Sequence, residues 1–330
     1  MRAGAVHILG RVRRSTVLRA TAWGVVAAGV AAPLARKRVS APPVVLQSVA
    51  FAAPLGLSVA MRRSRARDVA VCALQMWAYL AAYKSPHDDP DEQEGRTHFA
   101  YPIVADRALG LGELPTLRLQ RALARVGPEG PQWRAIDRVL VWTHWAWFAV
   151  PHGTVAYTLL RHPSRFPRAA AMTYAVFDVG ASFYWLIPTA PPWYAAADAL
   201  EAGDGPQVRR MMVEYGEHFW QDGWGPLYSV FGGNPLAAMP SLHFATSLMA
   251  ALLLAEVGAV AGALGVAYTA ALGFALVYLG EHYVVDLLAG AALTGAVRRL
   301  GPRAAPLAGR VARALAGLEA IAHEGGRGGA

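Results

Sequence analysis

The feature that most constrains this chain is a series of apolar segments that carry almost no charge. Residues 139–160, 239–255 and 257–280 contain no Asp, Glu, Lys or Arg. A helix needs about 20 mostly apolar residues to cross roughly 30 Å of hydrocarbon. Because helices satisfy their own backbone groups in lipid, these segments predict an all-α, polytopic membrane helical bundle. Weaker segments bring the expected number of spans to about eight, and they are residues 20–35, 39–61, 69–83, 169–188 and 282–297.

The composition excludes an ordinary soluble domain. The chain is 55% hydrophobic and only 16% charged, whereas about a quarter of the residues of a soluble domain are charged. The single cysteine, Cys72, excludes a disulfide framework or a cysteine-rich zinc site. The formal net charge is +9, but the arginines are spread between the apolar segments and do not gather on one polar domain. We therefore expect contact with membrane lipids and no nucleic-acid partner.

The arginines also predict the orientation of the spans, because short cytoplasmic connections are enriched in Lys and Arg. The basic clusters at 62–67, 161–168 and 298–313 all lie on the cytoplasmic side if the spans alternate, which places both termini inside. The basic residues 36–38 are the exception, and a signal peptide that ends near Ala35 is an alternative for the N-terminus. The chain is then divided into N-terminal spans or a signal or anchor segment (1–83), an outer-face segment (84–138), a membrane core that carries the chemistry (139–300) and a cytoplasmic tail (301–330).

Two long stretches outside the spans, 84–138 and 189–238, face outward in this scheme. The first is expected to contain a helix that lies in the headgroup plane or covers the core as a lid. This helix has an apolar face and a basic face, formed by Leu119, Leu123 and Val126 and by Arg118, Arg121 and Arg125.

The chemistry concentrates in Pro240-Ser241-Leu242-His243 and in His282-Tyr283-Val284-Val285-Asp286. Two passages of about 30 Å at about 1.5 Å per residue take roughly 40 residues, and the two histidines are separated by 39 positions (282 − 243). Both are therefore expected at the starts of inward-running helices on the outer face, where they meet in one pocket.

These residue types suggest acid–base and nucleophilic chemistry. His282 and Asp286 are four residues apart, so on a helix the carboxylate holds one ring nitrogen while the other faces substrate. His243 would then be the general acid. Ser241 is a candidate helix N-cap, and the free amides behind it form a seat for phosphate. Each motif taken alone is also compatible with packing, since a histidine near a membrane interface is often only hydrogen-bonded.

The chain resembles the type 2 phosphatidic acid phosphatase superfamily, and within it the branch that contains inositol phosphorylceramide synthase. The likeness covers roughly residues 100–300 and rests on Gly233-Asn234-Pro235 with AMPSLHFA (238–245), on GEHYVVDLLAG (280–290) and on IPTAPPWYA (187–195). The resemblance implies a six-helix core in which His282 takes the phosphoryl group as a phosphohistidine. Asp286 would orient this ring, His243 would protonate the leaving group, and Ser241 would contact phosphate.

The chain also departs from the hydrolases of that superfamily. Their first motif, a Lys followed after six residues by Arg-Pro, begins at neither Lys37 nor Lys84, and Ala275 and Leu276 replace the usual Ser-Arg pair. Other cationic or hydrogen-bond-donating side chains must then compensate the negative charge of the phosphate. The candidates are the outward-facing Arg107, Arg209 and Arg210.

We therefore expect a lipid phosphatase or phosphotransferase of the cell membrane, with its active site on the extracytoplasmic face and with no metal or cofactor. Its partners are a lipid phosphate substrate and membrane lipids, and the sequence does not identify a protein partner. A transporter and a metal-dependent membrane hydrolase are the alternatives, although the chain has no clear internal repeat and no His-Glu-x-x-His element.

His144, His152 and Asp178 lie in or near spans and are not assigned to catalysis. Trp142, Trp145, Trp147 and Trp185 are interpreted as interfacial anchors or packing residues, with a substrate groove as the alternative.

Overall fold

The computed structural model describes residues 2–36, 38–39, 41–84, 95–201, 208–231 and 233–324. The predicted outer-face residues 85–94 and tail residues 325–330 lie outside this description. Most of the described chain is helical, which confirms the all-α prediction. It divides into two compact units, Met1–Ser85 with Arg299–Ala330 and Pro86–Arg298, and each is described by itself.

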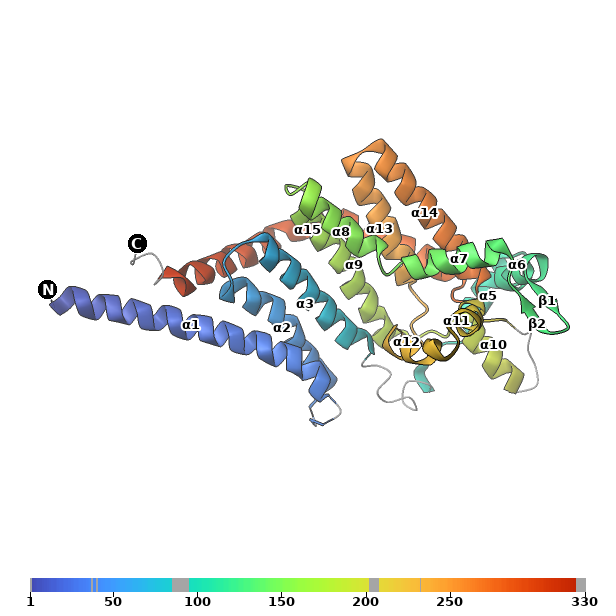
Figure 1. The fold of residues 1–330 in the computed structure, drawn as a ribbon, viewed down its shortest axis with the longest axis horizontal. Helices are drawn as coiled ribbons and strands as arrows, with labels where there is room; N and C mark the ends of the chain where they lie inside the picture. Colours follow the sequence, from blue (N-terminus) through green and yellow to red (C-terminus); the bar gives the residue numbers. More distant parts are fainter. Residues whose placement is uncertain are drawn as a thin grey trace. The chain divides into compact units, whose positions relative to one another are not determined.

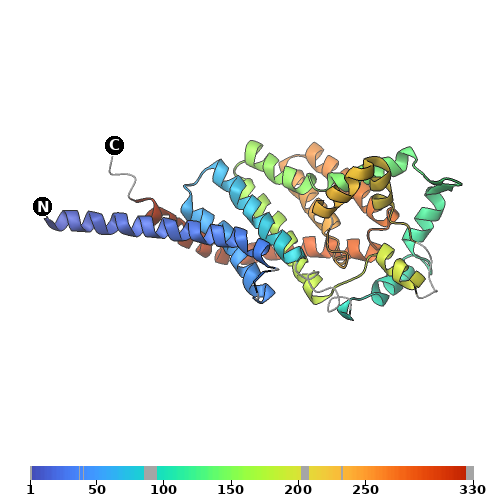
Figure 2. The ribbon, with the colours of Figure 1, turned by 60° about the horizontal axis from the view of Figure 1, so that its bottom comes forward.

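The first unit combines the N-terminal helices with the end of the last helix. Figures 1 and 2 both show α1, α2 and α3 side by side. Gly29 allows this packing, because a Cβ there would lie 2.6 Å from Ala53 Cβ. Arg67 forms an ion pair with Glu319 (3.1 Å), so the C-terminal segment is part of this unit. Its helices are α1 (Arg2–Ala35), α2 (Pro43–Ala60), α3 (Arg65–Lys84) and the C-terminal part of α15 (Val284–Ala322).

The second unit contains the helices that position the chemistry. An apolar hairpin of α13 and α14 turns at Gly258, and Gly265 lets the two helices approach closely, because a Cβ there would lie 2.7 Å from Ala251 Cα. The elements of the unit are α5 (Ala100–Leu109), α6 (Pro115–Leu123), β1 (Arg125–Gly127), β2 (Gly130–Gln132), α7 (Ala135–Ala146), α8 (Val150–Arg161), α9 (Phe166–Leu186), α10 (Pro192–Glu201), α11 (Met211–Trp220), a 3₁₀ helix (Gln221–Gly223), α12 (Trp224–Phe231), α13 (Leu242–Val257), α14 (Ala259–Tyr278) and the start of α15.

Three described helices are long and apolar enough to cross a membrane by length and composition. They are Arg13–Ala35 within α1, Pro43–Ala60 (α2) and Ala259–Tyr278 (α14), and the apolar helix α13 is shorter. The predicted segment 139–160 is not one helix, because α7 and α8 are separated by a turn at 147–149. Pro151, in the first turn of α8, explains the break, since proline cannot donate the hydrogen bond that would continue α7.

The expected amphipathic helix of the outer-face segment is also shorter than predicted. Helix α6 ends at Leu123, and Arg125 and Val126 lie on strand β1 of a two-stranded antiparallel sheet. The following turn contains Pro128, and Gly130 has a φ of +114°, so the chain forms a hairpin here and the helix does not continue. The apolar face of α6 is a protein contact, because Leu119 and Leu123 pack against the core.

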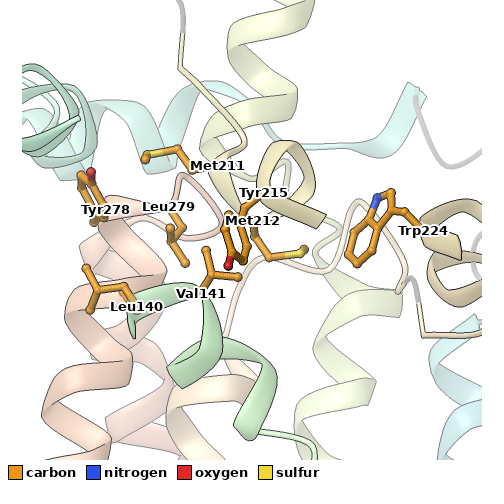
Figure 3. Packing of buried hydrophobic residues seen from close by; sticks show 9 residues of the cluster. Leu140, Val141, Met211, Met212, Tyr215, Trp224, Tyr278 and Leu279 are labelled. Carbon is orange, nitrogen blue, oxygen red and sulfur yellow. The ribbon is translucent and has the colours of Figure 1, made fainter. Parts of the chain in front are cut away.

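A hydrophobic cluster joins α7, α11 and α12 to the end of α14 (Figure 3). Gln120 of α6 fastens this region, because its side-chain amide donates to the main-chain oxygens of Arg209 (2.8 Å) and Tyr278 (2.9 Å). The end of α14 is thereby held in place just before the His282 motif begins. The cluster is formed by Leu140, Val141, Met211, Met212, Tyr215, Trp224, Ala275, Tyr278 and Leu279.

Candidate active site

The end of α14 determines where His282 lies. The N–H of Gly280 donates to Val277 O (3.3 Å) and the N–H of Glu281 donates to Leu276 O (3.0 Å), which is the hydrogen-bond pattern of a Schellman motif. Gly280 has a φ of +84°, the left-handed conformation that this motif requires and that glycine adopts without strain. The chain therefore turns sharply after the apolar helix and delivers His282 beside the core.

His282 does not lie on a helix, which corrects the expected shared helix face with Asp286. Helix α15 begins at Val284, two residues later, and Asp286 is in its first turn. The contact forms because the carboxylate reaches back over the helix start. Its Oδ2 accepts the Tyr283 N–H (2.9 Å) and lies 3.2 Å from His282 Nδ1. Asp286 is fully buried and His282 is 4% exposed, so the pair is shielded from water.

His243 lies in the first turn of α13, two residues after Ser241. Ser241 is the N-cap of this helix, as the sequence predicted, and its Oγ accepts the Phe244 N–H (3.3 Å). The hydroxyl is buried, and it lies at the positive end of a 16-residue helix.

The starts of α13 and α15 are joined directly. The Ser241 N–H donates to the main-chain oxygen of Asp286 (3.0 Å), and the Thr294 hydroxyl donates to Ala245 O (2.9 Å). Gly290 permits the approach, because a Cβ there would lie 2.7 Å from Ser241 O. Two histidines that are 39 positions apart in the sequence are brought into contact in this way.

The structure places His243 Nδ1 3.2 Å from His282 Nε2. A carboxylate only accepts hydrogen bonds, so contact with Asp286 favours the proton of a neutral His282 on Nδ1 and leaves Nε2 as an acceptor. The His243 Nδ1–H is then the donor to His282. This arrangement gives one ring a free electron pair in the position of a nucleophile and the other a proton beside it.

Two aromatic rings, one near the end of α7 and one in the turn that follows it, lie against His243. The ring centroid of Trp147 is 4.2 Å away, and that of His144 is 5.0 Å away. Trp147 is fixed by its indole N–H, which donates to Thr246 Oγ1 (2.8 Å). The sequence did not assign either residue to the site. The break that brings them there is signalled only by Pro151.

Asp106 of α5 is a further buried residue of the site that motif reasoning did not single out. Its Oδ1 accepts the Val285 N–H (2.9 Å), which satisfies an otherwise free donor at the start of α15. Burial raises the pKa of the Asp106 carboxyl, the amides of Val285 and Val284 lower it, and Asp286 raises it again, with a net rise. Asp106 thus holds the helix start that carries Asp286.

The candidate phosphate-binding arginines lie in different surroundings. Arg209 is paired with Glu214, with Nε 3.0 Å from Oε2. Arg210 is paired with Glu281, with Nε 3.1 Å from Oε1, and its guanidinium lies 3.8 Å from the centroid of the Trp193 ring. The exposed Arg107 forms no ion pair with any described carboxylate. None of these arginines has a described contact with His243, His282 or Asp286. No described group of three or more His, Cys, Asp or Glu side chains is arranged to hold a metal ion.

Comparison with known proteins agrees with this geometry at the level of the family. A family model described as PAP2 superfamily matches residues 132–300, just over half of the 330-residue chain. No curated protein and no solved structure gives a significant match. The matched segment contains both histidines, Ser241 and Asp286. The chain therefore belongs to the PAP2 superfamily, and this membership together with its apolar helices supports a membrane protein with phosphatase-type activity on lipid phosphoesters.

Proposed function

We propose that the protein transfers the phosphoryl group of a membrane lipid through a phosphohistidine on His282, in the manner of the inositol phosphorylceramide synthase branch. The observation that carries the proposal is the continuous contact from Asp286 to His282 to His243. It supports a nucleophile whose orientation and proton position are set by a buried carboxylate.

In the first step, His282 Nε2 attacks phosphorus, a P–N bond forms, and the P–O bond to the lipid alcohol breaks. His243, present as an imidazolium in this step, gives one ring proton to the departing oxygen and becomes neutral, so the leaving group is released as a neutral alcohol. In the second step, water or a hydroxyl acceptor loses a proton to His243 and attacks the phosphohistidine, which restores His282. In-line attack needs room for phosphorus between the two rings, so substrate entry must open the 3.2 Å contact.

The small number of cations near the site favours a phosphodiester donor. A phosphomonoester carries nearly two negative charges at neutral pH, whereas a diester carries one. The positions of the missing Ser-Arg pair, Ala275 and Leu276, are fully buried in the apolar core, so no cation takes their place there. Arg209 and Arg210 are paired with carboxylates. A singly charged lipid donor needs less compensation from such a site.

The test is incubation of the purified protein with labelled phosphatidylinositol, phosphatidic acid and polyprenyl phosphate, followed by measurement of free phosphate and new phospholipid products. We expect turnover with at least one donor and faster turnover with the diester. His282→Ala should abolish both turnover and any acid-labile phosphoenzyme, with the protein still folded. His152→Ala is the matched control, because this other span histidine lies against Phe177 and makes no described contact with His243 or His282.

Three outcomes contradict the proposal. Turnover retained by His282→Ala removes the nucleophile assignment. Turnover that is abolished by EDTA and restored by zinc favours a metal-dependent hydrolase, and vesicle uptake of a solute without phosphate release favours a transporter.

A further inference from the structure

His144 is a buried polar residue that the two-histidine chemistry does not use. It lies near the end of α7 and is 4% exposed. Neither of its ring nitrogens has a hydrogen-bond partner among the described residues. Buried polar side chains are ordinarily hydrogen-bonded, so an imidazole with two unpaired nitrogens calls for an explanation.

Its position relates this unpaired ring to the active site. The ring centroid lies 5.0 Å from that of His243, with the planes 32° apart, and the ring of His243 lies 5.3 Å from that of His282. The three imidazoles therefore form one contiguous group. His152, which is also in a predicted span, differs from His144, since its ring stacks at 3° on Phe177.

The chemistry of the site requires a donor that is not yet accounted for. A bound phosphate presents non-bridging oxygens that need hydrogen-bond donors. The described contacts of His243, His282 and Asp286 include no Lys or Arg, and the nearby Arg210 is engaged by Glu281. The start of α13 has main-chain amides that the helix itself does not pair, and His144, whose ring lies against His243 of that helix, is a further donor without a described partner.

We propose that His144 is a substrate-binding residue that donates a ring N–H to a non-bridging oxygen of the phosphate held at His243 and His282. Its unpaired state in the ligand-free protein follows from this role, because the ligand itself is the missing partner. The proposal rests on the proposed function for the identity of the ligand, and it adds a phosphate contact that replaces part of the missing cationic motif.

The probe is orthovanadate, a phosphate analogue, and binding is measured as the concentration-dependent rise in Tm of the detergent-purified protein. Loss of one hydrogen bond to a charged ligand weakens affinity about tenfold or more. We expect His144→Phe, which keeps a flat ring without donors, to lose at least this much. His144→Gln should recover part of the affinity because its amide is a donor, and His152→Phe should bind as wild type does.

Each outcome decides the proposal. Wild-type affinity in His144→Phe overturns it, and so does a His144→Gln variant that binds as weakly as the phenylalanine variant. If His144→Phe does not fold, His144→Leu provides a second variant without a donor for the same comparison. A wild-type protein that shows no orthovanadate binding also overturns it. By contrast, if His144→Phe weakens orthovanadate binding but the wild-type protein turns over no lipid phosphate, the proposed function is contradicted and the His144 contact is still supported.

Discussion

At the scale of single residues, the contact between His243 and His282 predicts how the enzyme depends on the leaving group. A general acid typically contributes about 10²- to 10⁴-fold to the rate, and it matters most when the departing alkoxide is a strong base. We expect His243→Ala to reduce kcat/KM by this amount for a lipid alkyl ester and by much less for a nitrophenyl ester, whose phenolate leaves without a proton. The measurement is kcat/KM over a series of esters with leaving groups of decreasing pKa.

The same series separates catalysis from packing. His243 also contacts Trp147 and His144, so its removal disturbs the surroundings of the site. A disturbance of that kind lowers the rate for every ester to a similar degree. Equal losses across the series would therefore show that His243 is not a proton donor.

Asp106 gives a residue-scale prediction about pH. Its carboxyl is fully buried, one oxygen has no described partner, and burial raises its pKa. The folded protein thus binds this proton more tightly than the unfolded chain does. The resulting stabilisation is fully present below the ordinary carboxyl pKa of about 4 and is lost as the pH rises through the raised value. Asparagine cannot titrate, so the difference in Tm between Asp106→Asn and wild type should move in favour of the variant as the pH rises from about 4 through the raised pKa of Asp106.

This prediction is checked by thermal unfolding in detergent at several pH values. Asparagine keeps the oxygen that accepts the Val285 N–H, so the helix start stays bonded. Asp222→Asn removes an exposed carboxylate and controls for the change in net charge. Parallel curves for Asp106→Asn and wild type would contradict the assignment of a buried titrating group.

At the scale of elements, the close approach of α13 and α15 is what holds the two histidines together, and Gly290 is its most sensitive point. A Cβ at Gly290 would lie 2.7 Å from the main-chain oxygen of Ser241, whereas a Cβ at Gly295 of the same helix meets nothing within 4 Å. Overpacking of this kind costs about 1–3 kcal/mol, and a shift of about 1 Å in a catalytic group can cost about 10²-fold in rate. Gly290→Ala should therefore lower Tm and reduce turnover at least tenfold.

Gly295→Ala is the matched control, because it makes the same change on the same helix without a steric clash. We expect it to keep wild-type turnover and to unfold at the same or a higher temperature, since alanine is the better helix former. Equal turnover in the two variants would mean that the spacing of α13 and α15 does not position the histidines.

The sequence predicted the helices better than the breaks and turns between them. Apolar segments and spacing were sufficient to predict the helices, the N-cap at Ser241 and the pairing of His243 with His282. The break at Pro151 was missed because it depends on a local backbone requirement, and His282 was placed on a helix that begins only at Val284. The roles of Asp106 and His144 were not predictable from the sequence, because they depend on which helices pack around the site, and no spacing in the chain encodes that arrangement.

At the scale of the whole molecule, the arginine clusters and the apolar helices together make a prediction about sidedness. Three described helices can cross a membrane by length and composition, and the basic residues after Arg298 are expected inside the cell. Helix α6 and strands β1 and β2 lie between α5 and α7 in the sequence, in the segment that we expect to face outward. Attachment of a membrane-impermeant maleimide to single cysteines in a Cys72→Ser background tests this assignment in intact cells.

Val126 of strand β1 is 67% exposed, and Ala305 is exposed on α15, so both accept a cysteine that can react. We expect Val126→Cys to be labelled in intact cells and Ala305→Cys only after permeabilisation, with lipid phosphate turnover unchanged in both. The reason is that Lys and Arg close to a span resist translocation across the membrane. The basic C-terminal part of α15 is therefore expected to stay on the cytoplasmic side. The opposite labelling pattern would place the histidine pair on the cytoplasmic face and restrict its substrates to lipids of the inner leaflet.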